Sequence, residues 1–186
     1  FGNSLINSSE IKEKKNLEII NPYDFEELKF DVIIGNPPYL KVEDMKNITP
    51  IELPIYKDNF KSAYKQFDKY FLFIEQGLNL LNEDGVLGYI VPSKFTKLGS
   101  GKNLRKLLSK NGNLKRIVSF GANQVFKDKT TYTCLLFTTK TSNETFTFTE
   151  VNNLTQWKIR DYNSLKFNHK KSSELSDGIW VLVNSD

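Results

Sequence analysis

A short apolar run that ends in two prolines constrains the fold more than any other part of this chain. Residues 30–34 contain three successive branched apolar side chains, which is typical of a buried strand, and the run ends at Gly35. Pro37 and Pro38 follow, and proline cannot donate a hydrogen bond to a sheet. The sequence therefore predicts a buried strand that stops at Gly35 and passes into a rigid turn.

Helix and strand patterns alternate along the next hundred residues. Apolar residues recur at helical spacing over 60–81, a strand pattern covers 85–91, and a short basic helix is expected at 103–109. Two stretches rich in β-branched and aromatic residues follow at 114–120 and 131–138. This alternation predicts an α/β fold with a mostly parallel, doubly wound sheet.

The last part of the chain differs in character. Residues 141–186 are polar with scattered aromatic residues, so we expect residues 1–140 to form one unit and residues 141–186 to be a linker with β-structure that leads into another domain. The chain begins at Phe1 and stops at Asp186 within a pattern, which suggests a fragment of a longer protein. Membrane-length apolar runs and a secretory signal are both missing, and we expect a cytoplasmic protein without a membrane partner.

Composition excludes several kinds of chemistry. The chain has one cysteine, Cys134, and one histidine, His169. A single cysteine cannot form an internal disulfide, and one histidine provides neither a metal cluster nor most forms of Ser-His or Cys-His catalysis. We therefore predict no metal site.

Positive charge is concentrated in the middle of the chain. Residues 94–140 contain eleven lysines and arginines against a single acid, Asp128, although the whole chain carries a formal net charge of only +4. Such a segment is either a solvated face or a phosphate-binding surface, and composition does not decide between the two.

The turn Asn36-Pro37-Pro38-Tyr39 is expected at the carboxyl end of a strand, where open α/β sheets bind ligands. The Asn36 side-chain oxygen and the Pro37 carbonyl are acceptors that together can bind one NH2 group. Accepting both of its hydrogens would direct the nitrogen lone pair at an electrophile, and Tyr39 could stack on the planar group. The alternative is an ordinary Pro-rich turn capped by an asparagine.

With this motif the sequence resembles the amino-methyltransferases that use S-adenosylmethionine, and most closely the adenine-specific DNA methyltransferases of type IIG restriction-modification enzymes. The resemblance covers residues 1–140 and implies the C-terminal part of a Rossmann-like methyltransferase fold with a terminal antiparallel strand. It implies that Asn36, Pro37 and Tyr39 hold a flipped adenine of double-stranded DNA.

The resemblance also nominates residues outside the turn. Asn3 lies in a segment similar to the one that contacts the adenine of the cofactor, and Phe71 lies in a stretch similar to the helix along its methionine end. Phe126 belongs to a loop similar to the one whose aromatic residue stacks on the other face of the base; for Phe71 and Phe126 a plain core role is the alternative. The family's glycine-rich cofactor loop is absent before Asn36, so we expect this fragment to be inactive without the remainder of a longer chain.

If the resemblance holds, basic residues near the expected site are the candidates for contact with DNA: Lys94, Lys97, Lys102, Arg105, Lys127 and Lys129. Residues 141–186 would then lead into a target-recognition domain.

Two other classes of protein share parts of the pattern. Release-factor glutamine methyltransferases and some ribosomal RNA methyltransferases also contain Asn-Pro-Pro-Tyr, because an amide NH2 poses the same chemical problem, and a non-catalytic DNA-binding piece of a defence complex is a further alternative. The long basic segment and the β-rich continuation favour nucleic acid as the partner. Cytosine ring methylation is disfavoured because Cys134 lies in a predicted strand and does not follow a proline.

Overall fold

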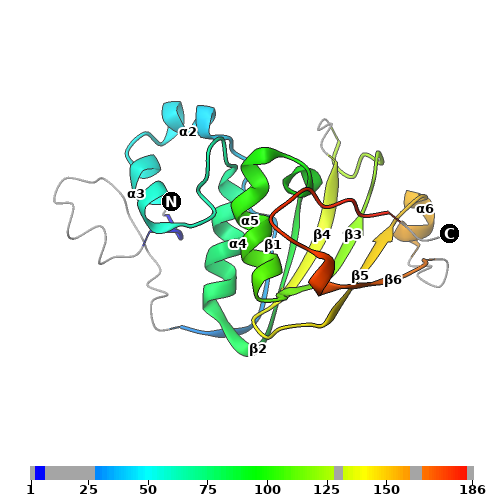
Figure 1. Ribbon diagram of the computed structural model, residues 1–186. Coiled ribbons are helices and arrows are strands. Elements are labelled where there is room, and N and C mark those ends of the chain that lie inside the picture. The colour runs from blue at the N-terminus through cyan, green and yellow to red at the C-terminus, as the bar shows by residue number, and fades with distance from the viewer. Residues whose placement is uncertain (1–2, 7–27, 128–131, 160–164, 184–186) are drawn as a thin grey trace.

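The computed structural model describes residues 3–6, 28–127, 132–159 and 165–183. Its centre is a six-stranded sheet in the order β1-β2-β4-β3-β5-β6 (Figure 1). Strands β1, β2, β3 and β5 run in one direction, and β4 and β6 run in the other. The strands are β1 (Phe30–Gly35), β2 (Leu81–Pro92), β3 (Leu114–Ser119), β4 (Thr133–Thr139), β5 (Thr145–Glu150) and β6 (Asn168–Lys171).

Two helices pack on one face of the sheet, α4 (Lys69–Leu80) and α5 (Lys102–Lys110) (Figure 1). Gly77 lies where α4 approaches β2, and a Cβ at this position would overlap the side chain of Leu87. This close contact explains a glycine inside a helix, where it otherwise costs about 1 kcal/mol relative to alanine. The fold is the α/β class with a mostly parallel strand direction, as the sequence predicts, and β4 is the antiparallel strand that the family resemblance implies.

Short helices surround this framework. Their bounds are α2 (Val42–Ile48), α3 (Glu52–Asn59) and α6 (Leu154–Lys158), with single 3-10 turns η1 (Ser93–Thr96), η2 (Gly99–Gly101) and η4 (Ser172–Glu174). Helices α2 and α3 follow β1 and lie at the end of the sheet where β1 and β2 finish (Figure 1). Within the described ranges, none of the helices is long and apolar enough to cross a membrane.

The helix predicted over 60–81 begins only at Lys69. Residues 60–68 form a loop whose Lys61 and Ser62 amides donate to the carboxylate of Glu75, at 3.0 and 2.8 Å. Phe67 is fully buried. Apolar residues of a buried loop therefore continued the helical spacing by coincidence, and the prediction of the helix start was wrong.

Strand β1 is less buried than predicted. The side chain of Val32 is 60% exposed and that of Ile34 is 81% exposed, whereas Ile33 packs against the core under α4. In the described part of the chain β1 has one neighbour, β2, so its outer edge and one face are open.

The segment after residue 140 continues the same sheet. β5 pairs in parallel with β3, and β6 pairs antiparallel with β5. The predicted β-structure is present, but these strands extend the first sheet and do not begin a second one. That residues 141–186 lead into a target-recognition domain stays a prediction.

We expect the 186-residue chain alone to self-associate, because an open strand edge with exposed apolar side chains pairs readily with another chain. Replacing Ile34 with lysine should shift the population toward monomer by placing a charge on this edge, as measured by light scattering. Ile159→Lys, at another exposed apolar position, is the matched control. A monomeric wild-type chain at high concentration would contradict the expectation.

Candidate active site

Asn36 directly follows β1 and is exposed. Among the residues that the structure describes, its side chain has no hydrogen-bond partner. Pro37, the next residue, is buried and fixes the backbone at this point. Asn36 thus lies at the carboxyl end of a strand, as the sequence predicts, and its role toward a ligand stays a prediction.

Tyr39 anchors the other end of the turn. Its hydroxyl donates to the carbonyl oxygen of Ile90 in β2 at 2.9 Å, and its ring meets that of Tyr70 edge to face with centroids 6.0 Å apart. Burial, with a smaller contribution from Cys134, raises the pKa of Tyr39 to about 12. Because the hydroxyl is bonded to a backbone carbonyl, the half-buried ring is the part of Tyr39 available for a ligand.

Three further contacts hold the turn against the end of β2. Tyr70 is fully buried and donates to the carbonyl of Pro92 at 3.0 Å, and the Lys69 amide donates to the carbonyl of Leu40 at 2.8 Å. Asp68 forms an ion pair with Lys94 at 2.9 Å. Sequence reasoning assigned no positioning role to Asp68 or Tyr70, because both lie inside the helix predicted over 60–81 and local spacing does not show their partners.

Phe126 lies on the same edge of the sheet but farther along it. The loop that carries it follows β3, and β2 and β4 lie between β1 and β3. With neighbouring strands about 4.8 Å apart, three spacings put these strand ends about 14 Å apart. Phe126 is half-buried. Its pairing with Tyr39 around an extruded base stays a prediction.

Asn3 is buried and belongs to a chain of hydrogen bonds. Its amide nitrogen donates to the Tyr56 hydroxyl at 2.7 Å, and its oxygen accepts from the Leu5 amide at 2.8 Å. The Tyr56 hydroxyl in turn donates to Glu52 at 2.7 Å, and Lys69 pairs with the same carboxylate oxygen. The Asn3 side chain also interacts with the Glu52 carboxylate, so its amide nitrogen is engaged within the protein and one lone pair of its oxygen remains for a ligand.

Phe71 does not lie as predicted for a cofactor contact. Phe71 is part of α4 and its side chain is fully buried, and the centroids of the Phe71 and Tyr70 rings are 4.7 Å apart. In this structure it supports the helix and offers no surface to a ligand, which is the alternative that the sequence left open.

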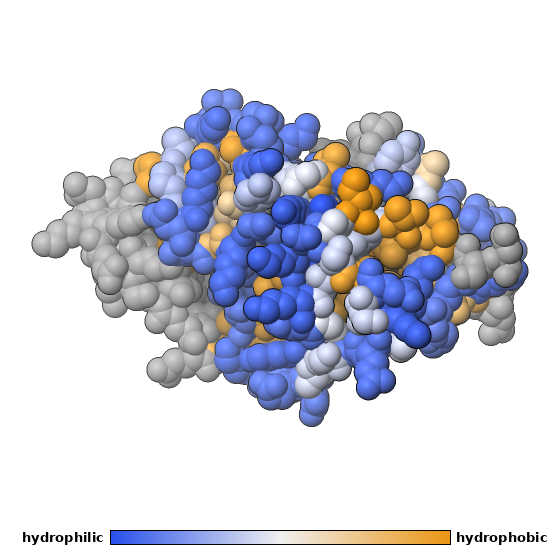
Figure 2. Space-filling view, in the orientation of Figure 1, coloured by the Kyte–Doolittle hydropathy of each residue, from blue (hydrophilic) through white to orange (hydrophobic). Residues whose placement is uncertain are grey.

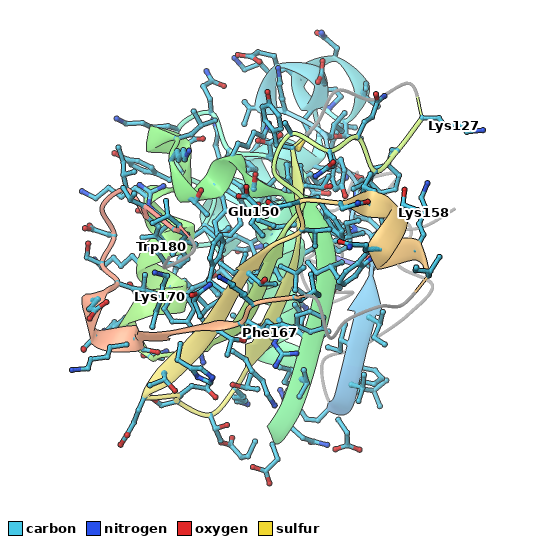
Figure 3. All side chains as sticks on the ribbon, turned by 90° about the vertical axis from the view of Figure 1, so that its right-hand side faces the viewer. Lys127, Glu150, Lys158, Phe167, Lys170 and Trp180 are labelled. Carbon is cyan, nitrogen blue, oxygen red and sulfur yellow. The ribbon has the colours of Figure 1, made fainter. Side chains whose placement is uncertain are left out.

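The predicted DNA-contacting residues fall into distinct groups. Lys97 and Lys127 are exposed near the carboxyl edge of the sheet, and Figure 3 shows Lys127 reaching away from the molecule. Lys102 is exposed and lies 3.5 Å from Asp177, and Lys94 is paired with Asp68. Lys129 lies outside the described residues.

Arg105 does not belong among them. It is buried, and its guanidinium donates to the carbonyls of Phe95, Leu98 and Asp177 at 2.6, 2.8 and 3.1 Å. A run of cations in the sequence cannot show which one folds inward, so its assignment to DNA was wrong.

A cavity of about 440 Å³ lies beyond the end of β2, lined by residues of η1, β3 and β5 and by the C-terminal segment. Lys94, Lys97, Glu150 and Trp180 are among the residues that line it, and Figure 3 shows that Glu150 and Trp180 come from separate segments of the chain. Figure 2 shows apolar side chains gathered over the C-terminal segment drawn red in Figure 1, where Ile179 and Val181 are exposed. This part of the carboxyl edge is therefore hollowed, with Lys94 and Lys97 in the wall of the cavity.

Charge reversal at Lys97 and Lys127 together should weaken binding of double-stranded DNA by the full-length protein about tenfold or more and reduce its salt dependence, because each exposed cation can neutralise one phosphate. Lys110→Glu and Lys115→Glu, at exposed lysines near the opposite end of the sheet where β3 begins, are the matched control. Equal affinity of the variant and wild type at low salt would return these lysines to the solvated-face interpretation.

The fold and the turn define a class: a Rossmann-like methyltransferase sheet with an Asn-Pro-Pro-Tyr turn at the end of a strand. Within this class the chain belongs to the Eco57I restriction-modification methylase family, whose model matches residues 2–126. It is 51% identical over 182 residues to the type II restriction enzyme and methyltransferase RM.Eco57I of Escherichia coli, covering 98% of this chain and 18% of that protein. The chain thus spans under one fifth of that relative's length.

Solved structures agree on the fold. The type IIG restriction endonuclease BpuSI superposes with a TM-score of 0.58 at 18% identity, over 82% of this chain and 20% of that one. The methyltransferase subunit of a type I restriction-modification system from Streptococcus thermophilus gives a TM-score of 0.53 at 19% identity, over 74% of this chain and 32% of that one.

Proposed function

We propose that this chain is the target-holding part of a DNA methyltransferase of a restriction-modification system, which transfers a methyl group to the exocyclic amine of adenine in double-stranded DNA. The observation that carries the proposal is the turn itself: an exposed, unengaged Asn36 beside the buried Pro37, at the carboxyl end of β1. Membership of the Eco57I family and the methyltransferase fold support it. The remainder of a longer polypeptide would complete the enzyme.

The turn would act on the amine in a simple way. The Asn36 oxygen and the Pro37 carbonyl accept its two hydrogens, so the nitrogen becomes tetrahedral and its lone pair points at the methyl donor. Tyr39 stacks on the base, and its hydroxyl bond to Ile90 keeps the ring in place. A general base before attack is unnecessary, because the methylated nitrogen can lose its proton afterwards.

The described residues fit one end of S-adenosylmethionine. The remaining lone pair of the Asn3 oxygen suits a donor on an adenine edge, such as its amino group. An apolar hollow of about 350 Å³ lies beside Ser4 and Leu5, with β1 and Gly77 among its walls. When bound, the cofactor supplies the methyl group.

The DNA would bind along the carboxyl edge of the sheet, with Lys97 and Lys127 on phosphates. Extruding a base costs a few kcal/mol, and stacking at about 1–3 kcal/mol per contact is of the size needed to offset it. Such a protein acts in the compartment that holds the DNA, in line with the cytoplasmic location expected from the sequence.

The test is transfer of a labelled methyl group by the full-length protein to duplex DNA, ribosomal RNA or a release factor offered separately. We expect label in DNA only. Label in the release factor or the RNA would support the corresponding alternative, and DNA binding without transfer to any substrate would support a non-catalytic role.

Phe126→Ala should weaken capture of the extruded base by about tenfold or more, because it removes one of two stacking surfaces. A duplex with 2-aminopurine at the target position reports this as a smaller rise in fluorescence on binding. Val125→Ala, in the same loop but packed against the core, is the control. An unchanged signal and rate for Phe126→Ala would show that this phenylalanine does not touch the base.

A further inference from the structure

Lys94 forms an ion pair with the buried carboxylate of Asp68. Its ammonium lies 2.9 Å from one oxygen of Asp68 and 3.1 Å from the other. The Asp68 side chain is 5% exposed and the Lys94 side chain 33%. Burial raises the pKa of Asp68, and the ion pair with Lys94 opposes that rise. The positive charge of Lys41 also lowers this pKa, and the negative charge of Asp44 raises it. A carboxylate this buried needs its partner.

Asp68 is fixed to the segment that directly follows the turn. It faces Lys41 in an isolated antiparallel bridge, and the amide of the next residue, Lys69, donates to the carbonyl of Leu40. Any shift of Asp68 would therefore move the backbone one or two residues beyond Tyr39.

Lys94 is fixed to the end of β2. It lies in η1, two residues after Pro92, whose carbonyl accepts from Tyr70. The ion pair thus joins Asp68, which is bridged to the segment after the turn, to the residues that follow β2. The bond from Tyr39 to Ile90 is a second link between the turn and β2.

We propose that Asp68 and Lys94 are a positioning pair that holds the Asn36-Pro37-Pro38-Tyr39 turn against the end of β2, and that Lys94 is not a contact to DNA phosphate. The proposal rests on the function proposed above. The Asn36 and Pro37 acceptors converge on one amine only when the turn and the end of β2 keep their spacing. A misplacement of about 1 Å in such an arrangement costs about a hundredfold in rate.

The two roles for Lys94 predict opposite results. If Lys94 bound phosphate, Lys94→Met would weaken DNA binding and reduce its salt dependence. Asp68→Asn would then release the lysine from its ion pair, and DNA affinity would stay unchanged or increase. For a positioning pair, Asp68→Asn and Lys94→Met each lower the single-turnover methylation rate about 10- to 100-fold while the DNA dissociation constant changes less than threefold. The double variant should be no slower than the slower single variant, because both remove the same link.

The experiment uses the full-length protein, its own DNA site, and the two single variants, the double variant and Lys94→Arg. Lys94→Arg keeps the charge and should retain most of the rate, whereas a role in bulk stability alone would show as a lower melting temperature with an unchanged rate in folded protein. If Asp68→Asn fails to fold, the comparison of Lys94→Met with Lys94→Arg carries the test. A full rate for Lys94→Met, or a rise of tenfold or more in its DNA dissociation constant, overturns the proposal. Absence of transfer by the wild type would instead refute the proposed function.

Discussion

Asn36→Ala in the full-length protein is expected to lower the methylation rate by about a thousandfold while DNA affinity stays within threefold. The side-chain oxygen acts on the amine during transfer and makes no contact with phosphate, so its loss removes stabilisation of the transition state and little of the binding. Removal of one such preorganised group costs about a hundred- to a thousandfold in other enzymes. The measurement is a single-turnover rate with a parallel binding isotherm.

Two further variants make this result specific. Asn36→Asp keeps an oxygen acceptor at the same place and should retain measurable transfer. Asn47→Ala, at an exposed asparagine in the nearby helix α2, should behave as wild type. Full activity of Asn36→Ala would refute the mechanism, whatever the other variants do.

Arg105→Ala should destabilise the protein by about 3–5 kcal/mol. The guanidinium donates hydrogen bonds to three backbone carbonyls. Each buried polar group that is left without a partner lowers the free energy of unfolding by about 1–3 kcal/mol. Gly101 lies against the same group, and a Cβ there would collide with the carbonyl of Phe95. Denaturant unfolding of the full-length protein, followed by a probe in this region, measures the loss.

The neighbouring lysine provides the comparison. Lys106→Ala changes an exposed cation on the same helix, and we expect its stability to stay within about 0.5 kcal/mol of wild type. Arg105→Ala protein that remains folded should bind DNA as wild type does. A stable Arg105→Ala variant with weakened DNA binding would restore the residue to the DNA-contacting set.

Local signals were sufficient for much of the fold and for the turn. The run of β-branched residues before Gly35 and the prolines after it placed the end of β1, because both effects act within a few residues of chain. The basic helix at 103–109 was correct to one residue at each end. The same reasoning failed for residues 60–68, where Glu75 stabilises a loop through the amides of Lys61 and Ser62, a contact between residues far apart in sequence.

Side-chain partners across the fold were beyond local signals. Lys94 and Arg105 belong to one basic run in the sequence. Only the packing of η1 near the start of α4 and against α5 shows that Lys94 pairs with Asp68 and that Arg105 binds carbonyls. Burial of Phe71 and exposure of Val32 depend likewise on which elements cover each face. The roles of Asn36, Tyr39 and Phe126 toward a base stay predictions, which methylation rates and base-capture measurements on variants would test.

Identification of the methylated atom tests the central claim most directly. The full-length protein would be incubated with duplex DNA and isotopically labelled S-adenosylmethionine, and the DNA digested to nucleosides and analysed by mass spectrometry. The account predicts label in N6-methyladenine at one sequence, and its absence with Asn36→Ala. Label in 5-methylcytosine, or N6-methyladenine formed equally by Asn36→Ala, would contradict it.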